Sequence, residues 1–386
     1  MQNNKDSILR AKPKELHYWL TSLLAVALLP ALRRSSLPLA FDWSRLVVSY
    51  WLVLAAQSVF TAALLLALQS PAKTLECLRQ RVRRKPALIV LWAIFFLALT
   101  VAVSWLKAVI LTVDALAILE VRERFTAAEQ RRAAGAVLIS ALYMFVGFLL
   151  VFAYNDVVLS LRFFASADAT LNSMDQWLLR GLSVSQICAW AATNLPISAF
   201  HVLEFIYFGM FAQIGAALIL VSAFAGRRMG LRFVGTVFVA YYLALAIFYL
   251  WPSQGPYYLS GGKIPSVLLV RSFQTQSLIN SAALWNHKQI NLISTDYYIA
   301  FPCMHIAQPL IVMWFLRRSR RILAVLAIYN ILLLPAIILL EWHYLVDILG
   351  GLVVGAIAIV AVNFDTFGQA FAPTQSSPLL AQNQGR

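Results

Sequence analysis

Residues 322–340 read ILAVLAIYNILLLPAIILL, an apolar run that contains no charged side chain. Its length is close to the roughly 20 residues that an α-helix needs to cross the hydrocarbon core of a bilayer. Comparable runs occupy residues 46–68, 199–224 and 233–251. Apolar residues make up 61% of the chain and charged residues only 12%, about half of the charged share that is usual in soluble domains. The sequence therefore predicts an all-α fold, a polytopic bundle of transmembrane helices.

Basic residues cluster in short segments between the apolar runs. These segments are 73–85, 122–132, 227–232 and 317–321, and the chain as a whole carries a net charge of +15. Lys and Arg next to transmembrane helices mark the cytoplasmic side, where they attract anionic lipid headgroups. This placement favours membrane lipids as partners of the chain and argues against a nucleic acid.

An inside N-terminus and inside basic segments together predict about ten spans. Residues 1–133 are expected to form N-terminal transmembrane helices of unknown role. In that region the run 87–119 is long for one helix and short for two. Six further spans are expected within the remaining two-thirds of the chain, at 134–152, 199–224, 233–251, 303–316, 322–340 and 343–362.

The segments between and after these six spans have distinct characters. An outer segment, 154–198, contains a stretch at 182–194 that fits a helix lying at the membrane interface. A long outer loop covers residues 252–301. The polar tail, residues 363–386, is expected to be disordered and cytoplasmic. The cysteines Cys77, Cys188 and Cys303 have no paired spacing, so we expect neither a disulfide framework nor a metal site.

Two histidines stand where polar outer segments run into apolar helices. One ends the stretch FPCMH, residues 301–305, and the other opens HYLVD, residues 343–347. The threading places both at the outer face, at the N-terminal ends of inward-running helices. Asp347 lies one helical turn after His343, where a carboxylate can accept the Nδ1 proton and leave Nε2 as nucleophile or base. The sequence thus predicts a reaction centre that contains His305, His343 and Asp347.

The surroundings of the two histidines favour a phosphate ligand. His305 follows Pro302 by three residues, which suits the first turn of a helix, and free backbone amides at that position bind anions. The preceding loop carries Lys263 and Arg271, whose side chains could clamp a phosphate. We expect phosphoryl transfer in which His343 attacks phosphorus and His305 protonates the leaving oxygen.

The stretches 301–305 and 343–347 resemble the second and third signature motifs of the type-2 phosphatidic acid phosphatase superfamily. The His-Tyr pair, the following Asp and Gly350-Gly351 make the chain most similar to the inositol phosphorylceramide synthase branch. The resemblance covers roughly residues 134–362 and implies a phosphatase-like core of six helices. It implies a phosphohistidine on His343, with Asp347 orienting that ring and His305 as the acid.

Some positions depart from the pattern of that superfamily. Cys303-Met304 stands where the second motif usually has Ser-Gly. Lys263 and Arg271 are one residue too far apart for the Lys and Arg-Pro of the first motif. We expect Lys263, Arg271 and Cys303 to contact the substrate phosphate.

The sequence thus predicts an integral-membrane phosphatase or phosphotransferase for a lipid phosphate, working at the outer, periplasmic or luminal, face. A bacterial plasma membrane is favoured over a Golgi membrane. The acceptor is water, a polyol such as inositol, or a lipid alcohol, and no metal or cofactor is required. Two alternatives stay open: a lipid or polyol transporter or flippase in which His343 and Asp347 relay protons, and a scaffold in which polar pairs only fix helix packing.

Overall fold

The computed structural model describes residues 39–40, 126–160, 166–285, 290–291 and 300–370. These residues form helices, apart from a parallel pair of two-residue strands, β1 (Leu39–Ala40) and β2 (Ile290–Asn291). The helices are α6 (Ala127–Ser160), α7 (Asp168–Leu178), α8 (Val184–Asn194), α9 (Ile197–Leu250), α10 (Pro256–Ser260), α11 (Leu269–Trp285), α12 (Met304–Leu316), α13 (Arg320–Leu339) and α14 (Leu345–Ala370). The predicted helical architecture is confirmed for this part of the chain. Most of the predicted N-terminal unit lies outside the described residues, so the total of about ten spans stays a prediction.

Four of these helices are long and apolar enough to cross a membrane, and they are α6, α9, α13 and α14. Many large apolar side chains on them point outward. Leu138 is 71% exposed, Ile328 is 63% exposed and Leu349 is 57% exposed. Helices that carry such side chains on their outer surface suit contact with lipid chains, where all backbone polar groups are already paired within the helix. The chain is an integral membrane protein.

The helix α9 contains a reversal of the chain at Gly226. This residue has φ of 83° and ψ of 171°, a conformation that glycine adopts without steric cost. A Cβ atom built on Gly230 would lie 2.2 Å from the Ser222 Oγ. Eight residues of a straight helix would instead separate these positions by about 12 Å. α9 is therefore a helical hairpin, and its two arms correspond to the spans predicted over 199–224 and 233–251.

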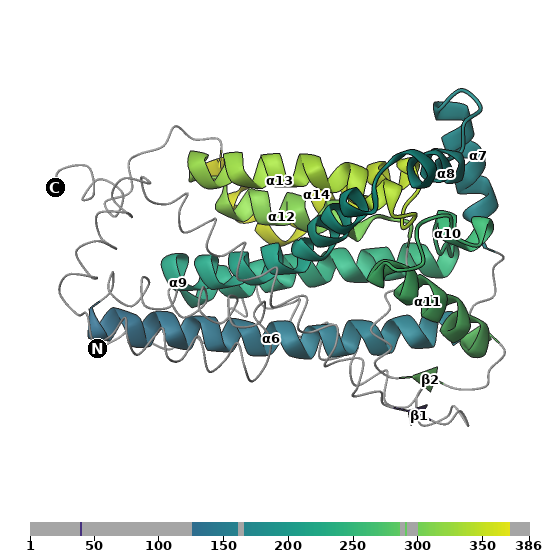
Figure 1. Ribbon diagram of the computed structural model, residues 1–386. Coiled ribbons are helices and arrows are strands. Elements are labelled where there is room, and N and C mark those ends of the chain that lie inside the picture. The colour runs from purple at the N-terminus through teal and green to yellow at the C-terminus, as the bar shows by residue number, and fades with distance from the viewer. Residues whose placement is uncertain (1–38, 41–125, 161–165, 286–289, 292–299, 371–386) are drawn as a thin grey trace, which may run out of the picture.

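The bundle packs around α9 and α12. Figure 1 shows α12, α13 and α14 side by side, α6 lying along α9, and the short helices α7, α8, α10 and α11 gathered at one end. Glycine permits the closest approach of α14 to the start of α12, because a Cβ on Gly351 would lie 2.2 Å from the Cys303 carbonyl oxygen. As a result, the N-terminal ends of α12 and α14 meet at the end where the short helices gather.

The segments outside the spans are more regular than expected. The predicted interfacial helix of 182–194 is present as α8, and the outer segment also holds α7. The loop 252–301 contains α10 and α11. The prediction that disorder begins at residue 363 was wrong for residues 363–370, since α14 continues to Ala370.

A buried side chain explains why α14 continues. Asn363 is non-helical and buried, and its amide donates to Thr236 Oγ1 at 3.2 Å and to the Ile359 carbonyl at 3.0 Å. The bond to Thr236 attaches this part of α14 to α9. The rest of the predicted tail lies outside the described residues.

Candidate active site

The rings of His305 and His343 meet at the junction of α12 and α14. His305 Nδ1 lies 3.0 Å from His343 Nε2, and the ring centroids are 5.1 Å apart. His343 is only 3% exposed. The structure therefore brings together the two histidines that the sequence singled out, although they are separated by 38 positions in the chain.

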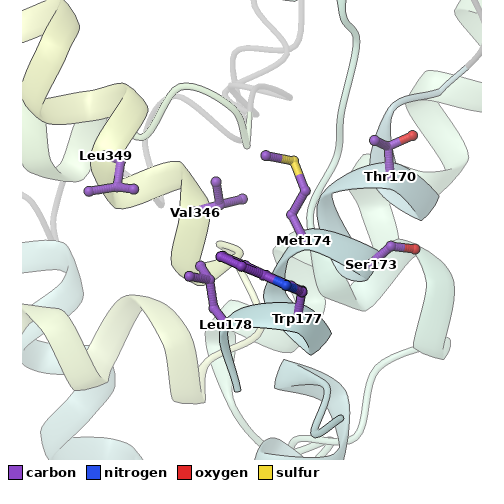
Figure 2. Close-up of a pocket in the computed structure, with 7 residues that line it drawn as sticks. All are labelled: Thr170, Ser173, Met174, Trp177, Leu178, Val346 and Leu349. Atoms are coloured by element: carbon purple, nitrogen blue, oxygen red, sulfur yellow. The ribbon is translucent and has the colours of Figure 1, made fainter. Parts of the chain in front are cut away.

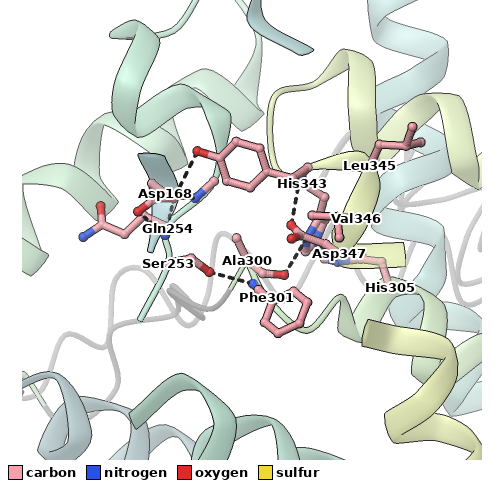
Figure 3. Close-up of polar contacts among 12 residues, drawn as sticks. Asp168, Ser253, Gln254, Ala300, Phe301, His305, His343, Leu345, Val346 and Asp347 are labelled. Carbon is pink, nitrogen blue, oxygen red and sulfur yellow. Dashed lines mark hydrogen bonds and ion pairs between the residues drawn. The ribbon is translucent and has the colours of Figure 1, made fainter. Parts of the chain in front are cut away.

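The partners of the other ring nitrogen define the tautomer of His343. Its Nδ1 lies 2.9 Å from the Ala300 carbonyl oxygen and 3.2 Å from Asp347 Oδ2. Both oxygens act as acceptors here, so Nδ1 must carry the hydrogen. In the neutral ring Nε2 then holds the free electron pair, and it accepts the hydrogen that His305 Nδ1 donates. The expected orienting role of Asp347 matches this geometry (Figure 3).

The first turn of α14 is held from outside by the carboxylate of Asp175 on α7. This carboxylate accepts hydrogen bonds from the backbone N–H groups of Leu345 at 2.7 Å and Val346 at 2.9 Å. Burial raises the pKa of the Asp175 carboxyl, against the lowering effect of these two donors. The side chain thus acts as a helix cap supplied by another helix, directly after His343.

A second carboxylate of α7, Asp168, holds the neighbouring loop. It accepts from the backbone N–H of Gln254 and of Gly255, and the Tyr344 hydroxyl donates to it at 3.2 Å (Figure 3). Burial raises the pKa of Asp168 as well. The sequence analysis did not single out Asp168 or Asp175. Their spacing of seven residues, two helical turns, was the signal that both lie on one face of a helix.

The turn before His343 depends on Glu341. This residue has φ of 58° and is fully buried. Its carboxylate accepts from the Ser260 hydroxyl at 3.0 Å and from the backbone N–H of Lys263 at 2.5 Å. An unusual backbone conformation is retained when surrounding contacts fix it. Glu341 therefore connects the turn that presents His343 to the end of α10.

Aromatic rings fix His305 from the side of α9. Tyr207 stacks on His305 with a centroid distance of 4.5 Å and on Trp342 with 5.7 Å. Trp342 in turn contacts Tyr257 edge to face. Tyr257 is fully buried, so it belongs to this cluster and not to an exposed aromatic belt. The stack limits the ring positions that are open to His305.

The three residues expected at the phosphate take different places. Cys303 is buried and forms the N-cap position of α12, and its backbone N–H donates to the Asp347 carbonyl at 3.2 Å. The Arg271 guanidinium donates to the Gly261 carbonyl at 2.5 Å. Lys263 is exposed. Among the described residues, neither cation forms a hydrogen bond or ion pair with the histidines, and of the three only Cys303 lies beside them.

An apolar groove of about 400 Å³ lies between α7 and the start of α14 (Figure 2). Val346 and Leu349 form one wall, and α7 forms the other. Trp177 at its edge is 81% exposed. The remaining lining residues are Thr170, Ser173, Met174 and Leu178. Val346 is three residues from His343 in the chain, but neither histidine is among the residues that line the groove.

Two histidines and a carboxylate at one end of an apolar helical bundle define a membrane protein with a phosphatase-like site. The profile of the PAP2 superfamily matches residues 169–361, half of the chain, and the chain belongs to this superfamily. Its members are lipid phosphatases or phosphotransferases, which supports this general enzyme class for the chain. The match does not point to the inositol phosphorylceramide synthase branch. No curated protein and no solved structure matches the chain.

Proposed function

We propose that the protein transfers a phosphoryl group or a phosphorylated headgroup from a membrane lipid through a covalent phosphohistidine on His343. The observation that carries this proposal is the chain of contacts from Asp347 to the His343 Nδ1 and from the His343 Nε2 to His305. It leaves an oriented nucleophilic nitrogen on one ring and a hydrogen on the other. These are the two groups that nucleophilic attack and protonation of a leaving group require.

The reaction proceeds in two balanced steps. His343 Nε2 forms a bond to phosphorus while the bond from phosphorus to the leaving oxygen breaks. His305 enters this step as the doubly protonated imidazolium, gives one proton to that oxygen and becomes neutral. His305 then accepts a proton from the second substrate, whose oxygen attacks phosphorus and releases His343. The positive charge on the His343 ring during these steps is stabilised by the Asp347 carboxylate.

Substrate binding has to separate the two rings. The direct contact of 3.0 Å leaves no room for a phosphorus atom between His305 and His343. A neutral hydrogen bond contributes only about 1 kcal/mol net. A phosphate that enters the site can therefore replace this contact at small cost, by accepting the hydrogen of His305 through one of its oxygens.

The apolar groove between α7 and α14 supports a lipid as the substrate. Its walls combine the bilayer-facing Leu349 with Trp177 of the outer segment, so an acyl chain can reach the groove from the surrounding membrane. A phosphate on the same lipid would lie toward His343. We also propose that the phosphate or its headgroup is contacted by Arg271, Lys263 and the Cys303 thiol.

The membrane side and the acceptor are also part of the proposal. Arg227 lies directly after the reversal in α9, Arg317 follows the end of α12 and Arg320 begins α13. By the positive-inside rule, these positions support a site at the outer face, periplasmic or luminal, with a bacterial plasma membrane favoured. The second substrate is water or an alcohol, and inositol is the alcohol that the motif resemblance suggests.

Covalent trapping tests this proposal. The purified full-length protein is incubated with a radiolabelled lipid phosphate, quenched in alkali and digested, and the label is located by mass spectrometry. We expect an acid-labile phosphate on His343 that is absent from the His343→Ala variant. A transporter with a proton relay would form no such adduct, so an unlabelled protein that still moves lipid would refute the proposal.

A further inference from the structure

The candidate site contains three donor groups that suit a soft metal ion. The Cys303 sulfur, one ring nitrogen of His305 and one of His343 all lie within 4.8 Å of one another. Cys303 occupies the N-cap position of α12, two residues before His305. The sequence spacing of the cysteines gave no sign of this cluster, since its third member comes from another helix.

The distances are close to those of a tetrahedral zinc site. Zn–N bonds of about 2.0–2.1 Å place two nitrogen ligands roughly 3.3 Å apart. His305 Nδ1 and His343 Nε2 are 3.0 Å apart, so a small widening would admit the ion. With a Zn–S bond of about 2.3 Å, the sulfur has to lie roughly 3.6 Å from each nitrogen. The observed limit of 4.8 Å requires the thiol to move by at most about 1 Å.

The surrounding contacts already hold these donors as metal ligands are usually held. His343 donates its Nδ1 hydrogen to Asp347 and to the Ala300 carbonyl, which leaves Nε2 free to ligate. A histidine ligand with a carboxylate on its other nitrogen is the common arrangement at zinc. The Cys303 backbone is fixed by its bond to the Asp347 carbonyl. His305 Nε2 is buried and has no hydrogen-bond partner among the described residues, so neither ring nitrogen of His305 is tied to a group outside the cluster.

We propose that Cys303, His305 and His343 bind a soft divalent cation, with Zn²⁺ as the best fit. A thiolate with two imidazoles favours zinc over the hard ions Mg²⁺ and Ca²⁺, which take oxygen ligands. The Cys303 thiol loses its proton when the ion binds. The hydrogen bond between the two histidines is lost, and His305 changes tautomer so that Nδ1 offers its electron pair and Nε2 carries the hydrogen. Three protein ligands leave a fourth position for water.

The bound ion has a consequence for catalysis, and this part rests on the proposed function. Zinc takes the electron pair of His343 Nε2, which is the pair that attacks phosphorus. It also holds His305 and His343 together, whereas the substrate has to separate them. Zinc therefore inhibits phosphoryl transfer, and Cys303, which stands where the superfamily usually has serine, confers this sensitivity.

Two measurements on the purified full-length protein test the proposal. The first is a titration with Co²⁺, which reports a thiolate ligand by a sulfur-to-cobalt charge-transfer band and needs no activity. The second is the Zn²⁺ concentration that halves the turnover of a lipid phosphate, measured relative to the uninhibited rate of each variant. Cys303→Ser is the test variant. Cys188→Ser is the matched control, because Cys188 is also buried but its thiol donates to the Ile338 carbonyl.

We expect the charge-transfer band in the wild type and in Cys188→Ser and its absence in Cys303→Ser. The half-inhibitory Zn²⁺ concentration should rise at least about tenfold in Cys303→Ser, an effect in the range of altered metal shells, and stay unchanged in Cys188→Ser. His305→Ala should weaken Co²⁺ binding while keeping the band. This variant tests the site if Cys303→Ser fails to fold. Absence of the band from the wild type would overturn the site. Equal zinc inhibition of wild type and Cys303→Ser would overturn the regulatory role of Cys303. A charge-transfer band in a protein without any turnover would instead refute the proposed function.

Discussion

Removal of the Asp175 carboxylate is expected to impair catalysis although this side chain contacts neither histidine in any described hydrogen bond. Asp175 lies on α7 and accepts from the backbone N–H groups of Leu345 and Val346, the first two residues of α14. His343 lies two residues before that helix. Asp175→Ala leaves the first turn of α14 without its cap, and the turn that presents His343 becomes free to shift.

The magnitude follows from the two hydrogen bonds. A hydrogen bond to a charged group contributes about 1.5–3 kcal/mol, and an unpaired buried donor costs about 1–3 kcal/mol. Burial raises the pKa of Asp175, which shows that desolvation of the carboxylate offsets part of this gain. We therefore expect a net loss of about 2–4 kcal/mol in stability. A shift of the ring by about 1 Å would lower kcat about 100-fold.

The assay compares kcat and KM for a lipid phosphate with thermal unfolding of the same detergent-purified protein. Asp175→Asn keeps one acceptor oxygen and should fall between the wild type and Asp175→Ala in kcat. Glu129→Ala is the control, because the exposed Glu129 carboxylate accepts from Thr126 at the start of its own helix, α6, far along the chain from the site. A variant Asp175→Ala with lowered thermal stability but wild-type kcat would show that the carboxylate stabilises the fold without positioning His343.

Two further predictions concern the nucleophile and the groove. Asp347→Asn should lower kcat by about 10²- to 10⁴-fold with little change in KM, because the amide no longer enforces the tautomer of His343. Single-turnover labelling of His343 measures this effect. An unchanged labelling rate would contradict the role of Asp347. Trp177→Ala should raise KM about fivefold for a long-chain lipid phosphate, since about 1 kcal/mol of apolar contact is lost, and should leave a short-chain soluble analogue unaffected. Trp190→Ala is the control for Trp177→Ala, because Trp190 on α8 is also exposed. Equal effects of both variants on KM would assign Trp177 to general membrane contact.

The sequence predicted the central residues of the site because their signals are local or follow from topology. Asp347 lies one turn from His343, and a single helical period specifies their contact. His305 and His343 were assigned to the same membrane face by counting spans from the basic segments. The observed contact of their rings agrees with that count for the described spans.

The supporting residues could not be predicted in the same way, because their partners are backbone groups of distant segments. Asp175 lies 170 positions from Leu345, and Asp168 lies 86 positions from Gln254. Backbone N–H groups have no residue identity, so no pattern in the sequence marks them as partners. Lys263 was proposed for its side chain, but the structure shows only its backbone N–H bound to Glu341.

The position of the site at the end of the bundle follows from the irregular backbone that it requires. Glu341 has a positive φ, and the turn around it, the segment at Gln254 and the entry to α12 all depart from helical geometry. Within the hydrocarbon core such backbone would leave polar groups unpaired, at a cost of several kcal/mol each. Near the interface, the buried carboxylates Asp168, Asp175 and Glu341 pair with these backbone groups. The phosphate of a membrane lipid also lies at the interface, which supports the phosphoryl-transfer site that we propose at these helix ends.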